Sequence, residues 1–167
     1  MAEEFKMKPL YQALRQTSAL VGLELLLAIG GNQCRPGGIK LLGDWSDNAR
    51  FADASGQSLV IPLEEARDLF EEDEVLFVDA RPESQYQEGH LPGALLIPWQ
   101  EVDRYFMEAA EQLEEGKAIV AYCDGESCEL SHELALFLKD MGFPNARVLV
   151  NGWSVWRNAD LPVEEGN

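Results

Sequence analysis

The sequence predicts an α/β fold: a mostly parallel five-stranded sheet covered by helices on both faces, with a separate helix before it. Two observations lead to this prediction. From residue 58 onward, short apolar runs alternate with segments whose apolar residues recur at helical spacing, which is typical of βαβ units and a parallel sheet. The chain has 167 residues and is 46% hydrophobic, which suits one sizeable core plus an extension better than two full domains.

Five apolar runs are expected to form the strands. They are residues 58–62, 74–80, 94–98, 118–122 and 146–150. The second run is almost continuously apolar, as a parallel strand buried on both faces should be. In such sheets ligands bind beyond the carboxyl ends of the strands, so the residues that end these runs are candidates for a site.

Helices are expected between the strands because apolar residues there repeat every three or four positions. The segments are residues 62–70, 99–113 and 130–143, and a short helix follows Asn151 and Gly152. Pro62 suits the start of a helix and Gly142 suits the end of one. Asn at position 151 tolerates the left-handed conformation that its turn needs.

We predict three parts of the chain: residues 1–30 as an apolar helix, residues 31–57 as a linker or wrapping segment, and residues 58–167 as the α/β domain. The glycines and proline of residues 30–38 are expected to end the first helix.

The first helix is expected over Pro9 to Ile29. Its apolar stretch, Ser18 to Gly31, has 14 residues and contains Glu24, so it is shorter than the ~20 residues that a transmembrane helix needs. We therefore expect the helix to bury an apolar face against protein, with peripheral contact to a membrane as the alternative. An exposed apolar helix would also favour a homodimer.

Charge and cysteine content narrow the classes of function. The formal net charge is −17, which disfavours binding to nucleic acid and to anionic membranes. Three cysteines, Cys34, Cys123 and Cys128, are too few and too irregular for a disulfide framework or a metal site. We expect free thiols, no metal, no cofactor and a cytoplasmic location, with membrane association through the first helix as the alternative.

Cys123 is the candidate for chemistry because it ends a buried strand just before a polar loop and a helix. Asp79 also ends a strand, so both are expected at one edge of the sheet. Backbone N–H groups of the loop, Asp124 to Glu129, could form an anion nest that favours a thiolate. The acidic side chains of that loop act against it, and a buried, inert cysteine is the alternative.

The chain resembles a rhodanese domain, a sulfurtransferase module, over about two-thirds of its length. The matching stretches are VDARPESQYQEGHLPGA (Val78 to Ala94), IVAYC (Ile119 to Cys123), LALFLKDMGFPNARVLVNGW (Leu134 to Trp153) and LPVEEG (Leu161 to Gly166), in family order and at family spacing. The resemblance implies a doubly wound parallel sheet.

The resemblance also implies that Cys123 takes sulfur from a small donor or a protein persulfide and passes it to a thiol or other nucleophilic acceptor. The amides of residues 124–128 would hold that sulfur. These residues are Asp124, Gly125, Glu126, Ser127 and Cys128.

The loop departs from the family pattern because it lacks an arginine and is about two residues longer, so that Ser131 takes the place of the serine at the helix start. A guanidinium would bind an anionic donor such as thiosulfate. Classical thiosulfate:cyanide activity is therefore in doubt, while persulfide donors remain suitable.

Cys128 could resolve a persulfide on Cys123 by forming a disulfide, and the alternative is that it only fills space. Asp79 and Arg81 resemble family positions that brace the wall of the site, and His90 is expected to be structural. Two other hypotheses stay open beside sulfur transfer. One is a protein-binding or regulatory module with little catalysis, and the other is a dithiol redox protein.

Overall fold

The computed structural model describes residues 2–35, 43–113, 116–125 and 128–166. It divides into two compact units, Met1–Gly43 and Asp44–Asn167, which are described separately. The predicted linker, residues 31–57, is shared between them.

In the described part of the first unit the chain forms one helix, α1 (Ala2–Gln33). The helix begins before Pro9 and continues through Gly30 and Gly31, so the predicted bounds were too narrow. A glycine costs about 1 kcal/mol relative to alanine inside a helix, and this cost does not stop a helix of 32 residues. The stretch Leu10–Gln33 is long and apolar enough to cross a membrane, and its side chains are not buried inside the protein.

The second unit is a parallel sheet with the strand order β2-β1-β3-β4. The strands are β1 (Val75–Asp79), β2 (Leu95–Leu96), β3 (Ala118–Tyr122) and β4 (Arg147–Leu149). All three strand pairs are parallel, which confirms the predicted class of fold. Residues 75 and 77–79 of β1 and 119–122 of β3 are buried, as their continuous apolar runs predict.

The prediction of a fifth strand over residues 58–62 was wrong, because the sheet has four strands in the part of the chain that is described. This segment forms only an isolated parallel bridge between Val60 and Val148. Two hydrogen bonds hold it to the edge of β4, from the Val148 N–H to the Leu59 carbonyl (2.8 Å) and from the Ile61 N–H to the Val148 carbonyl (2.9 Å). The next N–H that would face β4 belongs to Leu63, and because α3 begins at that residue the ladder ends there.

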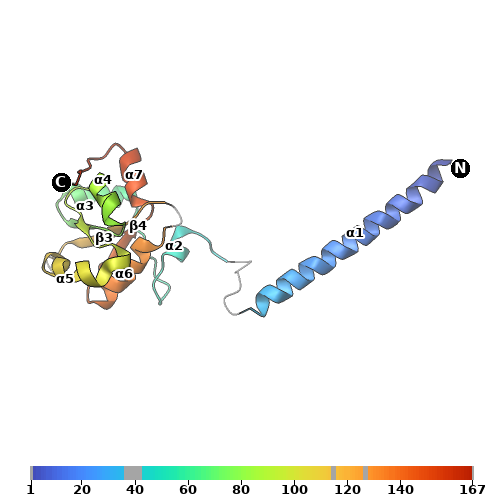
Figure 1. Ribbon diagram of the computed structural model, residues 1–167, viewed down its shortest axis with the longest axis horizontal. Helices are drawn as coiled ribbons and strands as arrows, with labels where there is room; N and C mark the ends of the chain where they lie inside the picture. Colours follow the sequence, from blue (N-terminus) through green and yellow to red (C-terminus); the bar gives the residue numbers. More distant parts are fainter. Residues whose placement is uncertain (1, 36–42, 114–115, 126–127, 167) are drawn as a thin grey trace. The chain divides into compact units, whose positions relative to one another are not determined.

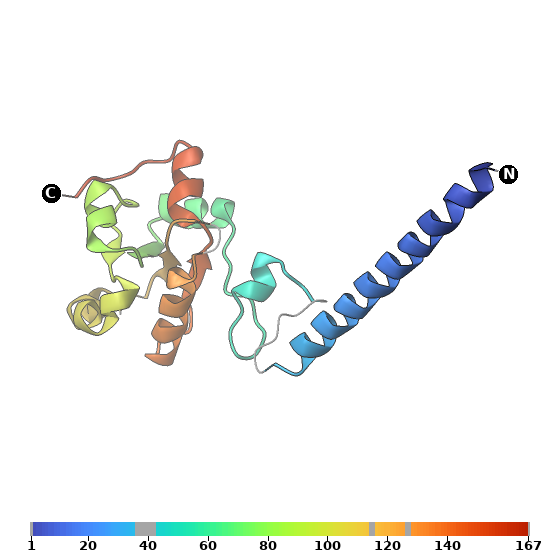
Figure 2. The ribbon, with the colours of Figure 1, turned by 45° about the vertical axis from the view of Figure 1, so that its right-hand side comes forward.

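Helices cover both faces of the sheet (Figures 1 and 2). On one face, α5 (Val102–Leu113) and α6 (Leu130–Asp140) form a core with alternate strand residues. On the other face, α3 (Leu63–Glu71), α4 (Glu83–Glu88) and α7 (Gly152–Asn158) pack around Trp156. A single 3-10 turn, η1 (Trp99–Glu101), precedes α5, and a short helix α2 (Asp47–Arg50) precedes Phe51, which is buried in the first core.

Candidate functional site

Cys123 follows directly after β3, and only 1% of its surface is exposed. Successive residues of a strand point to opposite faces of the sheet. Ile119, Ala121 and Cys123 belong to the core under α5 and α6, whereas Val120 and Tyr122 belong to the core under α3 and α7. The sulfur of Cys123 therefore points toward the start of α6.

Cys123 forms a disulfide bond with Cys128, and the Cα atoms of the two residues are 6.5 Å apart. This pairing corrects the prediction of free thiols, and its physical basis is the turn of the loop, which places the two side chains side by side. Cys34 is free and exposed. The role of Cys128 in resolving a persulfide on Cys123 stays a prediction.

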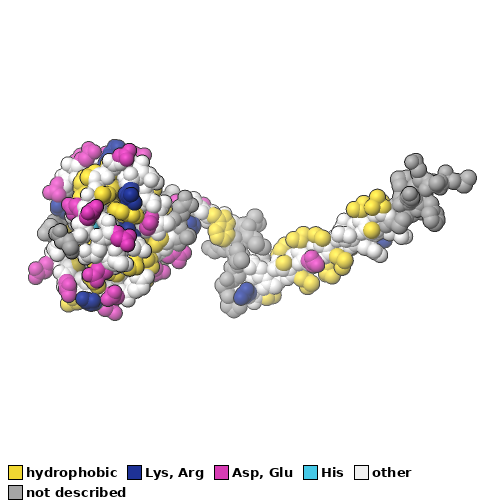
Figure 3. Space-filling model, turned by 45° about the horizontal axis from the view of Figure 1, so that its top comes forward, with side chains coloured by type: hydrophobic (Ala, Val, Ile, Leu, Met, Phe, Trp, Pro, Cys, Tyr) yellow, Lys and Arg dark blue, Asp and Glu magenta, His cyan; other side chains and the backbone are white. Residues whose placement is uncertain are grey.

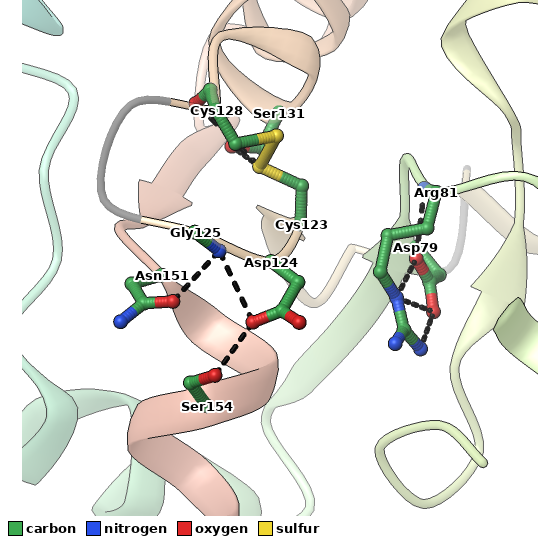
Figure 4. The surroundings of a disulfide bond; sticks show 9 residues. All are labelled: Asp79, Arg81, Cys123, Asp124, Gly125, Cys128, Ser131, Asn151 and Ser154. Carbon is green, nitrogen blue, oxygen red and sulfur yellow. Dashed lines mark hydrogen bonds and ion pairs between the residues drawn. A yellow bond between two sulfur atoms is a disulfide. The ribbon is translucent and has the colours of Figure 1, made fainter.

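Ser131, in the first turn of α6, lies against this disulfide (Figure 4). Its hydroxyl oxygen is 3.3 Å from Sγ of Cys123, and the Ser131 residue is 1% exposed. Because a disulfide sulfur carries no hydrogen, the hydroxyl is the donor in this arrangement. Ser131 thus contacts the candidate nucleophile from the first turn of α6, and its supporting role stays a prediction.

Hydrogen bonds with residues at the start of α7 hold the first part of the loop after Cys123. The N–H of Gly125 donates to Oδ1 of Asn151 (2.8 Å) and lies 3.1 Å from Oδ1 of Asp124. The Ser154 hydroxyl donates to the same Asp124 oxygen at 2.6 Å. Figure 4 shows Asp124 turned toward Ser154 while Cys123 turns the other way. Gly125 has a φ of +93°, which favours glycine there.

Two of the amides predicted to hold the sulfur have other partners in this arrangement. The N–H of Cys128 donates to the carbonyl of Gly125 (3.1 Å), and the N–H of Gly125 is directed at Asn151. Glu126 and Ser127 lie outside the described residues. The sulfur cradle of residues 124–128 therefore remains a prediction for the reduced loop.

Asp79 and Arg81 form a buried ion pair at the carboxyl end of β1. Asp79 is fully buried and Arg81 is 3% exposed. Nε of Arg81 lies 3.0 and 3.1 Å from the two carboxylate oxygens, and one of its terminal nitrogens donates to Asp79 Oδ2 (2.6 Å) and to the carbonyl of Gly89 (2.7 Å). The guanidinium also lies 4.5 Å from the ring centre of Trp153.

Tyr122 joins this ion pair to the strand that carries Cys123. Its hydroxyl donates to Asp79 Oδ2 (2.7 Å) and accepts the N–H of Leu91 (3.1 Å). Burial raises the pKa of Tyr122 well above its ordinary value, and the Asp79 charge adds to this rise. Burial acts to lower the pKa of Arg81, but the hydrogen bonds and charge of Asp79 outweigh it, and the net shift is upward. Tyr122 is therefore held as a neutral phenol beside the protonated guanidinium of Arg81.

A polar hollow of about 520 Å³ lies beside Asp124 and is lined mainly by residues of α4 and α7. Arg81, Ser84, Gln85, Glu88, Asp124, Trp153 and Arg157 line it. Arg157 lies over the Trp153 ring at 5.2 Å. The cations near the loop thus come from other segments, whereas sequence reasoning looked for one within the loop.

His90 has the structural role predicted for it. Its ring stacks on Tyr86 with 3.7 Å between centroids, and Nδ1 is 3.0 Å from the Tyr86 carbonyl oxygen. The sequence did not predict the contacts that Tyr122, Ser154 and Arg157 make near the loop. Asn151 was predicted only for its backbone conformation, and its side-chain contact with Gly125 was missed. For Asn151 the signal was present, because its φ is +52° as expected. In the described ranges, no group of three or more His, Cys, Asp or Glu side chains could hold a metal ion.

Comparison with known proteins places these features in a family. Residues 62–159 match the family described as "Rhodanese-like domain". A 96-residue stretch is 41% identical to an HTH-type transcriptional regulator, Rv0324, of Mycobacterium tuberculosis, and the match covers 56% of this chain but 39% of the regulator. The chain is also 27% identical to the thiosulfate sulfurtransferase GlpE of Coxiella burnetii, over 62% of this chain and 90% of that protein.

A solved structure supports the fold. The rhodanese-like domain of the Anabaena protein Alr3790 superimposes with a TM-score of 0.54 at 22% identity, over 65% of this chain and 80% of that one. At this identity the likeness concerns the fold alone.

Proposed function

Because the chain belongs to the rhodanese-like domain family, we propose that it carries sulfane sulfur as a persulfide on Cys123 and passes it to a thiol or another nucleophile. The observation that carries this proposal is the position of Cys123. It follows β3 directly, is the first residue of the loop that leads to α6, and has the Ser131 hydroxyl 3.3 Å from its sulfur. The family includes sulfurtransferases, among them the Coxiella relative.

The reaction needs the reduced loop. The Cys123 thiolate attacks the outer sulfur of a donor persulfide, forms Cys123–S–S⁻ and releases the donor as a thiolate. An acceptor thiolate then takes the outer sulfur, and Cys123 returns to a thiolate. The Cys123–Cys128 disulfide blocks the first step, so a reducing compartment such as the cytoplasm suits this activity.

The donor that suits this loop is a thiol persulfide rather than thiosulfate. Residues 124–129 contain two glutamates and one aspartate and no arginine or lysine. An anion with two negative charges would be repelled there, whereas a persulfide brings at most one charge at the reacting end. Both the small-molecule donor and a protein persulfide fit this argument.

A regulatory binding module is the second candidate, and the similarity to part of a transcriptional regulator favours it. In that case the α/β unit would recognise a partner with little or no turnover at Cys123. A Cys123→Ser protein would then keep its biological role, which sulfur transfer would not allow.

The proposed function is tested by intact-protein mass spectrometry on reduced protein, treated separately with glutathione persulfide and with thiosulfate. Cys123→Ser and Cys128→Ser proteins are treated in parallel. A gain of one sulfur atom from glutathione persulfide, seen in the Cys128→Ser protein and lost in the Cys123→Ser protein, is the expected result. No gain of sulfur from either donor in the Cys128→Ser protein would reject the proposal.

A further inference from the structure

We propose that Cys128 makes this chain a persulfide reductase that releases hydrosulfide. In this step the Cys128 thiolate attacks Sγ of Cys123 in the persulfide, the bond to the outer sulfur breaks, and the outer sulfur leaves as HS⁻. The product is the Cys123–Cys128 disulfide. The inference rests on the proposed function, because it needs sulfur on Cys123.

The turn between the two cysteines sets the distance for this attack. Their Cα atoms are 6.5 Å apart, within the range that a disulfide spans without backbone movement, about 4.4–6.8 Å. The hydrogen bond from the Cys128 N–H to the Gly125 carbonyl closes the turn, and the bond from the Gly125 N–H to Asn151 fixes it to α7. Reaction between neighbouring thiols on one turn has a high effective concentration.

The burial of Cys123 determines whether an attacking thiol reaches the inner or the outer sulfur of its persulfide. Sγ of Cys123 belongs to a residue that is 1% exposed and packs against Ser131. An external thiol therefore reaches only the outer sulfur of the persulfide, and attack there transfers sulfur. Cys128 lies beside the inner sulfur, and attack there forms the disulfide and expels the outer atom.

The electrons balance within the step. The sulfane sulfur gains two electrons and becomes hydrosulfide, while the two cysteine sulfurs lose two electrons and become a disulfide. A second turnover requires a dithiol reductant, which exchanges with the disulfide and is itself oxidised. The substrate class is thus a thiol persulfide together with a dithiol, and the products are a thiol, hydrosulfide and an oxidised dithiol.

The step is tested without oxygen, so that the persulfide is the sole oxidant. Reduced full-length protein receives one equivalent of glutathione persulfide, and intact mass and released sulfide are followed together. We expect the unaltered protein to become lighter by two hydrogens and to release about one hydrosulfide per chain. The Cys128→Ser protein should keep the added sulfur and release roughly tenfold less sulfide. Cys34→Ser is the matched control and should behave as the unaltered protein does.

Two results would overturn the inference. If the unaltered protein keeps its persulfide as long as the Cys128→Ser protein does, Cys128 does not resolve it. If the Cys128→Ser and Cys128→Ala proteins release sulfide as fast as the unaltered protein, another group does. A Cys128→Ser protein that never gains sulfur instead rejects the proposed function, so the two failures can be told apart.

A second, independent observation concerns α1, for which we propose a bilayer as the partner. The segment Leu10–Gln33 has 24 residues, or about 36 Å of helix at ~1.5 Å per residue, against a hydrocarbon thickness of about 30 Å. Leu25, Leu26 and Leu27 are consecutive and all exposed. Consecutive residues project in different directions around a helix, and Figure 3 shows apolar side chains along both visible edges of this one.

This distribution distinguishes lipid from the other partners. A helix that packs on protein or lies in the membrane surface needs one apolar face and one polar face. Between Ser18 and Gly31 the one charged residue is Glu24, so a polar face is missing there. Arg15, nearer the start of the segment, can extend its guanidinium toward the lipid headgroups.

Membranes from cells that express the full chain test this second inference. We expect the protein to float with the membranes in a density gradient, to resist alkaline carbonate and to be released by detergent. A Leu25→Lys/Leu27→Lys protein should shift to the soluble fraction, and Gln12→Lys/Gln16→Lys, outside the core of the span, should not. A carbonate-soluble full-length protein, whether monomer or dimer, would overturn the inference.

Discussion

The Tyr122 hydroxyl donates a 2.7 Å hydrogen bond to Oδ2 of Asp79, across the β1–β3 register that pairs these two residues. Tyr122 immediately precedes Cys123, and Asp79 holds Arg81. The end of the strand that carries the candidate nucleophile is therefore tied to a buried ion pair on the neighbouring strand. The loop that follows Cys123 therefore starts at a strand end that buried hydrogen bonds hold in place, as a preorganised site requires.

Replacing Tyr122 by Phe should lower the free energy of unfolding by about 1–3 kcal/mol, because Asp79 Oδ2 and the N–H of Leu91 both lose a buried partner. Urea unfolding measures the change. Tyr11→Phe is the control, since Tyr11 is 70% exposed on α1. A loss equal to that of the control would show that the hydroxyl is not held as described.

The same residue should make stability depend on pH in the alkaline range. Burial raises the pKa of Tyr122 in the folded protein, so above about pH 10 the unfolded chain has lost a proton that the folded chain retains. The stabilising contribution is fully present below that pH and is lost as pH rises. Unfolding free energies between about pH 8 and 11 should thus fall less steeply for Tyr122→Phe than for the unaltered protein. Equal slopes would contradict this expectation.

Much of the fold could be predicted because its central strands, β1 and β3, are buried on both faces. The continuous apolar run at β1 and the helical spacing in α6 each have few competing explanations. Helix α4, with the sequence ESQYQE, has no apolar stripe and was missed for that reason. The prediction of a fifth strand failed because strand pairing depends on neighbouring segments. Residues 59–61 reach β4 through one bridge, and α3 begins at Leu63 before the pairing can extend.

The site could be predicted from the sequence only where a reactive side chain lies at the end of a strand. Cys123 could be placed because parallel strands end at one edge of the sheet. The bond between Tyr122 and Asp79 joins residues 43 positions apart and depends on strand register, which the sequence pattern does not specify. Arg157 lines the hollow beside the loop from α7, and no spacing rule connects it with Cys123.

Removing the charge of Arg81 should be among the most damaging single changes. Arg81→Ala leaves the fully buried Asp79 carboxylate without its cation, and breaking such a pair costs about 3–5 kcal/mol. Arg81→Lys should cost less, since it keeps the charge but loses the two-pronged contact. Denaturant unfolding gives both values.

The exposed pair of Arg104 and Glu101, 3.4 Å apart, is the matched control for that experiment. Arg104→Ala should change the free energy of unfolding by about 0–1 kcal/mol, since exposed pairs are screened by water and salt. If Arg81→Ala cost no more than this, the ion pair at the end of β1 would not be the brace that its burial indicates.

We expect Asn151 to stabilise the loop between Cys123 and Cys128 in two ways that can be measured separately, through its backbone conformation and through its side chain. Its φ is +52° and its Oδ1 accepts the N–H of Gly125. Asn151→Gly keeps the left-handed backbone but loses the hydrogen bond, whereas Asn151→Ala loses both. The alanine protein should therefore be less stable than the glycine protein by about 1–2 kcal/mol.

Reduction of the disulfide separates the side-chain effect from the backbone effect. Without the Gly125 bond, worth about 0.5–1.5 kcal/mol, the loop should open more readily, and reduction by a small thiol should be roughly 2–10-fold faster in the Asn151→Gly protein. Thiol alkylation followed by mass spectrometry gives the rates. Ser154→Ala, which leaves the Asn151 contact in place and loses only the bond to Asp124, is the matched comparison. An unchanged reduction rate in Asn151→Gly would mean that the hydrogen bond between the Asn151 side chain and Gly125 does not control the loop.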